Sequence, residues 1–131
     1  MFYASFTQGD LDGDGRPELI VAWKPLLGAG YFEKMMRVGD LDGDGRNELV
    51  VSTRADDSEG AETPGHVFAY HLLPGGETER ETVIELDRRY AESSWLAIGD
   101  ADNDGKLDLV LATGMGDRQD AGESWVLRLW R

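Results

Sequence analysis

The stretch "GDLDGDGRPELIVAW" occupies residues 9–23, and the chain repeats it as "GDLDGDGRNELVVST" at 39–53 and as "GDADNDGKLDLVLAT" at 99–113. In each copy an acidic, glycine-rich loop leads directly into a run of Leu, Ile or Val. Short apolar runs bounded by Gly and Asp are typical of β-strands. Each loop is also preceded by a stretch with strand character, at 2–8, 32–38 and 94–98. The sequence therefore predicts three strand, loop, strand hairpins.

Further strands are predicted between and after the hairpins. Residues 66–73 and 82–86 have strand composition and are joined through the turn-forming sequence Pro74, Gly75, Gly76. A last strand is predicted at 124–130. The near-continuous apolar runs that follow the loops are typical of strands covered on both faces. We therefore predict an all-β fold of antiparallel hairpins.

The spacing of the copies predicts how the chain is organised. The second copy starts 30 residues after the first, whereas the third starts 60 residues after the second. We predict one repeat domain over 1–131, divided into a truncated two-stranded unit at 1–30, a four-stranded unit at 31–90 and a three-stranded unit at 91–131. The last unit is expected to be continued by another segment or chain.

The charge of the chain is concentrated in the three loops. The 131 residues include 26 acidic and 13 basic side chains, for a formal net charge of −13. Nucleic acid is an unsuitable partner, because phosphate binding requires a basic face. No apolar stretch reaches the roughly 18 residues of a membrane span, and the absence of cysteine excludes disulfides and thiolate metal sites. Twelve acidic residues lie in the loops: Asp10, Asp12, Asp14, Glu18, Asp40, Asp42, Asp44, Glu48, Asp100, Asp102, Asp104 and Asp108.

The spacing of these carboxylates predicts a calcium site in each loop, with up to three ions per chain. Counting Asp10, Asp40 or Asp100 as position 1, carboxylates fall at positions 1, 3, 5 and 9, and several hard oxygen ligands on a tight loop favour Ca²⁺. Glycine at position 6 allows the sharp turn. The backbone carbonyl at position 7 is predicted to add a ligand. The predicted carbonyl ligands belong to Arg16, Arg46 and Lys106.

An EF-hand is excluded by the second half of the pattern. An EF-hand loop places a bidentate Glu at position 12, but that position is occupied here by Val21, Val51 and Leu111. The flanking segments also have strand rather than helix character. The loop is therefore expected to return the chain into a sheet.

The three quoted blocks resemble the calcium-binding FG-GAP and VCBS-type repeats of integrin α-subunit head propellers and of secreted bacterial β-propellers. The resemblance implies that each loop joins the first two strands of a blade and that the carboxylates and carbonyls named above are the calcium ligands. A propeller uses four to eight four-stranded blades. Because this chain is too short for four, we expect a partial β-propeller of two to three blades.

The leading functional prediction is a non-catalytic, calcium-stabilised module that binds a protein or a glycan, as in cell adhesion. The predicted partners are a protein, further blades of the same or another chain, a glycan, or a second copy in a homo-oligomer, with no insertion into a membrane. An extracellular or periplasmic location is expected, because calcium is abundant there. No signal peptide is visible in the sequence.

The alternative is a carbohydrate-active propeller, either a fragment of an enzyme similar to rhamnogalacturonan lyases or a lectin. No catalytic constellation stands apart from the predicted calcium ligands. His66 and His71 are five residues apart, so they are expected on opposite faces of one strand as ordinary sheet residues. The chain's four tryptophans are candidates for sugar stacking, although core packing is the favoured role: Trp23, Trp95, Trp125 and Trp130.

Overall fold

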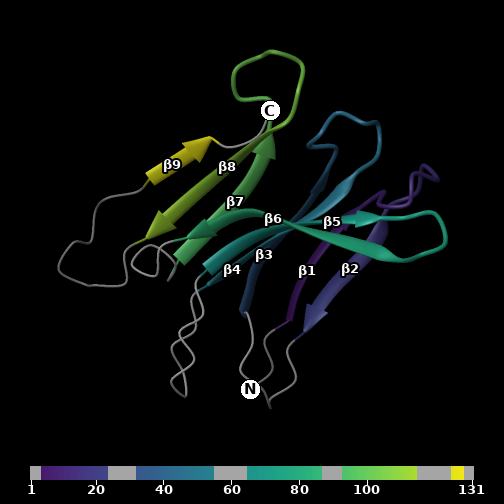
Figure 1. Ribbon diagram of the computed structural model, residues 1–131, viewed down its shortest axis with the longest axis horizontal. Helices are drawn as coiled ribbons and strands as arrows, with labels where there is room; N and C mark the ends of the chain where they lie inside the picture. The colour runs from purple at the N-terminus through teal and green to yellow at the C-terminus, as the bar shows by residue number, and fades with distance from the viewer. Residues whose placement is uncertain (1–3, 24–31, 55–64, 87–92, 115–124, 129–131) are drawn as a thin grey trace.

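The computed structural model describes residues 4–23, 32–54, 65–86, 93–114 and 125–128 (Figure 1). These residues form strands, loops and turns with no helix, and thus no helical segment that could cross a membrane. The strands are β1 (Ala4–Gly9), β2 (Glu18–Trp23), β3 (Phe32–Gly39), β4 (Glu48–Arg54), β5 (Gly65–Leu72), β6 (Thr78–Leu86), β7 (Ser93–Gly99), β8 (Asp108–Gly114) and β9 (Trp125–Arg128). The prediction of an all-β chain is confirmed for the described residues.

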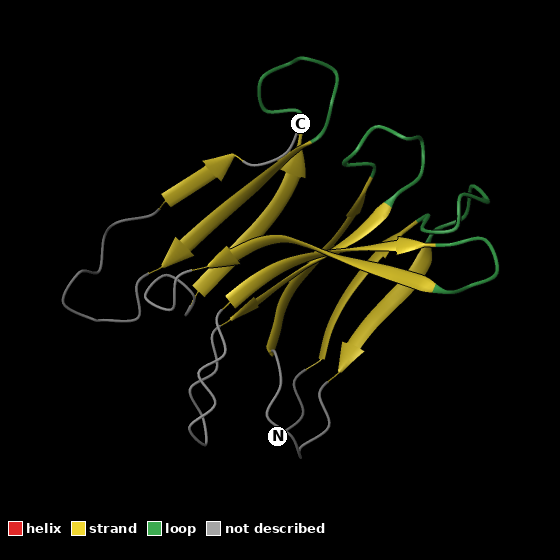
Figure 2. Ribbon diagram, in the orientation of Figure 1, coloured by secondary structure: helices red, strands yellow, loops and turns green. Residues whose placement is uncertain are grey.

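The strands form three antiparallel sheets in which sequence neighbours pair. The first sheet contains β1 and β2, the second contains β3 to β6, and the third contains β7 to β9. The second sheet lies between the other two (Figure 1). All three acidic loops leave the sheets on the same side of the molecule, where Figure 2 draws them in green. The predicted unit boundaries near residues 30 and 90 lie outside the described residues and stay predictions.

Strand β6 begins earlier than the sequence indicated. The prediction started this strand at Thr82, but pairing with β5 begins at Thr78. The added residues include Glu79, Arg80 and Glu81, which are exposed. Charged side chains are suited to the edge of a sheet, where they stay hydrated and discourage pairing with another chain. Because these residues are polar, the sequence did not indicate a strand here. Their polarity suits the position of β6 at the edge of the second sheet.

The apolar runs after the loops differ in how they are covered. In β4, Val50 is 0% exposed within the cluster shared with the third sheet, and Val51, on the opposite face, is 5% exposed. This confirms the prediction of a strand covered on both faces. In β2 the prediction is wrong, because Leu19 and Val21 are 70% and 52% exposed. Within the described ranges, the first sheet has a neighbouring sheet on one face only.

The hydrophobic core fills the space between the second and third sheets. Its partly buried border includes Met35, whose sulfur accepts a hydrogen bond from the Leu96 N–H at 3.3 Å. The side chains of Trp23, Trp95 and Trp125, and all of Trp130, lie outside what the structure describes. The core cluster consists of Leu41, Val50, Val67, Leu96, Leu109 and Leu111.

The glycine before each loop sets how closely adjacent sheets approach. A Cβ atom built on Gly9 would lie 2.6 Å from the Cβ of Val38, and one on Gly39 would lie 3.0 Å from Cδ1 of Leu107. Both glycines therefore pack directly against the next sheet. For Gly99, at the same place in the third hairpin, the described part of the chain has no atom within 4 Å of an added Cβ.

Replacing Gly9 should therefore lower the free energy of unfolding, whereas replacing Gly99 should not. We expect Gly9→Ala to lower the free energy of unfolding by about 1–3 kcal/mol through overpacking against Val38. Gly99→Ala is the matched control and should leave it unchanged or slightly raised in dilute solution, where each chain stands alone. Thermal and urea unfolding of the two variants measure the difference. Equal losses would contradict the packing role of Gly9.

Candidate metal centres

The aspartate at position 1 organises each acidic loop through hydrogen bonds from the backbone. Its two carboxylate oxygens accept different N–H groups. Asp10 accepts from Gly13 at 2.8 Å and from Gly15 at 2.9 Å. In the second loop Asp40 accepts the equivalent bonds from Gly43 and Gly45 at 2.8 and 2.9 Å. The hydrogen bonds to one carboxylate group thus hold the turn of each loop.

Two positions of each loop adopt a backbone conformation that suits glycine. At position 6, Gly15, Gly45 and Gly105 have φ of 86°, 89° and 84°. This confirms the turn role predicted for these glycines, because side chains disfavour positive φ. Position 4 also has positive φ, and in the third loop it is filled by Asn103 at 59°. Asparagine tolerates this left-handed conformation better than most residues.

The acidic residue at position 9 closes each loop onto the strand. One of its oxygens accepts a hydrogen bond from the N–H of position 2. The three bonds are Leu11 to Glu18 at 2.7 Å, Leu41 to Glu48 at 2.9 Å, and Ala101 to Asp108 at 2.9 Å. Glu48 and Asp108 are each only 2% exposed. Buried carboxylates require hydrogen-bond partners, which gives position 9 a structural role in addition to its predicted role as a ligand.

The structure brings the predicted carboxylates together to different degrees. In the first loop all four offer oxygens within 4.8 Å of one another: Asp10, Asp12, Asp14 and Glu18. In the second loop the group is Asp40, Asp42 and Asp44, and in the third it is Asp100, Asp102 and Asp108. Asp104 is outside the third group. The carbonyls of Arg16, Arg46 and Lys106 stay predicted ligands.

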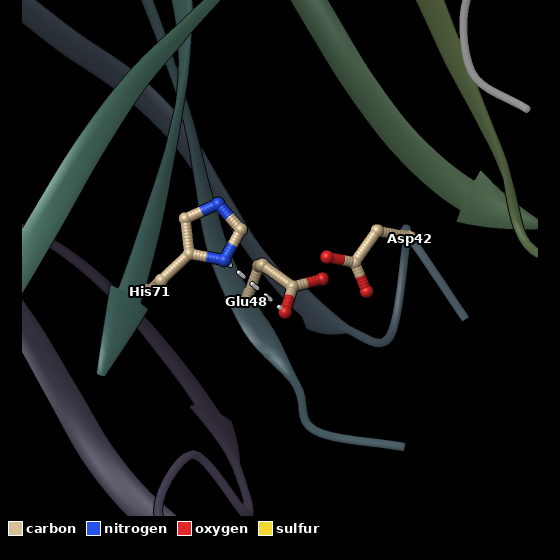
Figure 3. Close-up of side chains that lie close together, drawn as sticks. All are labelled: Asp42, Glu48 and His71. Atoms are coloured by element: carbon tan, nitrogen blue, oxygen red, sulfur yellow. Dashed lines mark ion pairs between the residues drawn. The ribbon is translucent and has the colours of Figure 1, made fainter. Parts of the chain in front are cut away.

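A second group in the middle hairpin contains a histidine that sequence reasoning did not select. Asp42, Glu48 and His71 offer ligand atoms within 4.8 Å of one another (Figure 3). His71 Nδ1 lies 3.6 Å from Glu48 Oε1, and its Nε2 lies 3.5 Å from an oxygen of Glu81. The register explains the contact: Leu49 pairs with Tyr70, so Glu48 and His71 are the next cross-strand neighbours. Only the pairing of β4 with β5 could have revealed it.

The carboxylates of the second loop differ in electrostatic environment. Burial raises the pKa of Glu48, although the Leu41 N–H and nearby His71 act in the opposite direction. The pKa of Asp44 is lowered, first by the Arg46 N–H and then by the Arg46 guanidinium, which lies 2.9 Å from Asp44 Oδ2. Burial of a charged carboxylate is unfavourable. A cation beside Glu48 would relieve this cost.

The first two loops are also connected directly. The side-chain amide of Asn47, at position 8 of the second loop, donates a hydrogen bond to the backbone carbonyl of Asp10 at 2.6 Å. At the same position of the third loop, Leu107 packs against Gly39. Position 8 therefore carries the side chain that reaches the preceding hairpin. This role was not visible in the sequence, because Pro17, Asn47 and Leu107 share no chemistry.

The raised pKa of Glu48 predicts a pH-dependent penalty in the metal-free protein. The folded state holds the proton of the Glu48 carboxyl group more tightly than the unfolded state does. The protonated Glu48 therefore contributes fully to stability below its ordinary pKa of 4.5, and this contribution is lost as the pH rises through the raised pKa. Glu48→Gln cannot ionise but keeps an acceptor for Leu41. In chelator, we expect the melting temperature of Glu48→Gln to rise relative to the wild type between pH 4.5 and neutrality.

The exposed turn residue Glu77 provides the control for this experiment. Glu77→Gln removes the same charge from a site without buried carboxylates and is expected to follow the wild type. A constant difference between Glu48→Gln and the wild type over the whole pH range would refute the penalty.

Comparison with known proteins identifies the repeat. A family model described as an FG-GAP-like repeat matches residues 40–111, just over half of the 131 residues. The match begins at the first aspartate of the second loop and ends within β8, so it contains the second and third loops. No curated protein and no solved structure matches the chain. The resemblance to FG-GAP repeats drawn from the acidic loops is confirmed, and the chain belongs to the FG-GAP-like repeat family.

Proposed function

We propose that the protein is a non-catalytic binding or scaffold module of the β-propeller type, stabilised by calcium ions in its acidic loops. Its partner is a protein or a glycan, and its place of action is extracellular or periplasmic. The observation that carries the proposal is the first loop, where four carboxylates converge within 4.8 Å on a backbone that is already hydrogen-bonded around them.

The chemistry of the loops favours calcium over other ions. The convergent groups of the first loop are all carboxylates, which are hard oxygen ligands. Ca²⁺ takes six to eight such ligands in flexible geometry, whereas Zn²⁺ and Cu²⁺ prefer nitrogen or sulfur. Four carboxylates with the predicted carbonyl of Arg16 leave positions that water can complete.

The proposed calcium ions have a structural role, because the negative charge of the chain is concentrated in the loops that would bind them. Twelve of the chain's 26 acidic residues lie in the three loops. The backbone N–H bonds offset part of the repulsion within each loop, but they do not neutralise it. A cation that binds the folded loop and not the unfolded chain adds its binding free energy to the stability of the fold.

The arrangement of the sheets supports a propeller-type scaffold. Three antiparallel sheets pack side by side, and their acidic loops project from one side (Figure 2). Propellers are built from repeated sheets of this kind. Membership of the FG-GAP-like repeat family supports the same architecture. An extracellular setting suits calcium sites of modest affinity, because calcium is abundant there.

Calcium should raise the melting temperature, and chelator should lower it. A ligand present at about one hundred times its dissociation constant stabilises a single site by about 2.7 kcal/mol. For a domain of this size, one loaded site should shift the melting temperature by roughly 10 °C. Scanning calorimetry with calcium, with magnesium and with chelator measures the effect. A melting temperature that is the same in calcium and in chelator would remove the proposal.

Substitution at position 3 tests each loop separately. Asp12→Asn, Asp42→Asn and Asp102→Asn each remove one carboxylate charge and keep a side-chain carbonyl as a hydrogen-bond acceptor. We expect each variant to lose one calcium ion in native mass spectrometry and to gain less stability from calcium. Glu77→Gln, on the exposed turn, should keep the wild-type ion count. Unchanged counts in all three loop variants would show that the ions bind elsewhere.

A further inference from the structure

The second sheet offers one face to the hairpin before it and the opposite face to the hairpin after it. The second sheet meets the first through the face that carries Val38, which packs on Gly9. Its other face carries Gly39, which meets Ile98 and Leu107 of the third hairpin. The same interface therefore occurs twice within one chain. In each case the residue before the loop glycine of one hairpin packs on the loop glycine of the preceding hairpin: Val38 packs on Gly9, and Ile98 packs on Gly39.

The first sheet exposes the face that is covered in the other two. Phe6, Leu19 and Val21 share this face through the register of β1 and β2, and they are 75%, 70% and 52% exposed. Their counterparts in the third hairpin are Leu96, Leu109 and Leu111, at 2%, 0% and 0%. These three leucines occupy the same positions relative to their loop as Phe6, Leu19 and Val21, and the second sheet buries them. Three exposed apolar side chains therefore lie together on this face of the first sheet.

The third sheet exposes the complementary face. Among the described residues no atom lies within 4 Å of a Cβ built on Gly99, although Gly9 and Gly39 are both in close contact with the following hairpin. On the same face Ala97 is exposed and Val110 is only partly buried, whereas Val50, the counterpart of Val110, is 0% exposed. Gly99 and Val110 therefore stand where Gly39 and Val50 receive the third hairpin within the chain.

We propose that two copies of this chain associate head to tail, with the Phe6, Leu19 and Val21 face of one copy seated on the Gly99 face of the other. These two faces are the two halves of an interface that the chain already makes twice, and in the described residues each half is without its counterpart. The proposal rests on the propeller-type binding function above and names its partner.

The chemistry of the two faces favours a second copy over a charged partner. Phe6, Leu19 and Val21 on one face, and Ala97, Gly99 and Val110 on the other, are uncharged, so apolar burial is the attraction that these positions offer. The register also pairs Gly99 with Asp108, which is 2% exposed, and Val110 with Arg128. In the docked pair Gln8 takes the place that Val38 and Ile98 hold within the chain. Two copies contribute six of the sheets that the structure describes, which is within the four to eight of closed propellers. Interfaces between unlike faces close into rings or extend into filaments, and a dimer that makes this interface twice is a closed ring.

Two substitutions disable the two faces separately. Leu19→Glu places a charge in the exposed apolar face, and Gly99→Leu fills the open position on the other. Both positions are uncrowded in the single chain, so circular dichroism should show an unchanged fold. For the wild type, analytical ultracentrifugation over a concentration series with calcium should give a mass of twice 14.5 kDa. Each variant alone should sediment as a monomer.

Mixing the two variants provides the decisive result. Because each retains one intact face, they should form a 1:1 heterodimer that native mass spectrometry identifies by its mass. Thr82→Glu, an exposed charge on β6, is the control and should associate like the wild type. A wild type that stays monomeric at every concentration, or variants that stay monomeric when mixed, would overturn the proposal. Calcium ions counted in the same spectra separate this outcome from a failure of the calcium sites.

Discussion

The hydrogen bond from the N–H of position 2 to the carboxylate of position 9 is the constraint on which the structure depends. It closes each acidic loop at a fixed length, so the two strands of the hairpin must leave in one register. A register shift of one residue would move every side chain to the other face. The bond therefore determines which residues enter the core and which face the neighbouring hairpin. The carboxylates at positions 1, 3 and 5 are placed around this closure.

The sequence predicted those features that depend on neighbours within one hairpin. The strands, the acidic loops and the turn glycines follow from local patterns, because strand composition, loop length and positive φ are local properties. The features it did not predict depend on partners distant in the chain. His71 reaches Glu48 through the pairing of β5 with β4, and Asn47 contacts Asp10 across 37 residues.

The three copies also differ in ways that their near-identical sequences conceal. Position 5 joins the carboxylate group in the first loop through Asp14 but not in the third through Asp104. Position 9 joins the group in the first and third loops, whereas Glu48 of the second is turned to Asp42 and His71. Apolar residues that look equivalent, such as Val21 and Val51, are exposed in one hairpin and buried in another. For Val21 and Val51 the difference follows from the neighbouring sheets that each hairpin has.

The bond between Asn47 and Asp10 has a consequence for how the molecule unfolds. Pairing within each sheet is between strands adjacent in sequence, so the molecule is a linear array of coupled units. Cooperativity in such an array comes only from the joints between units. The Asn47 amide ties the backbone of one loop to the next hairpin at such a joint. Ordering of one loop therefore raises the melting temperature of the hairpin that is bonded to it.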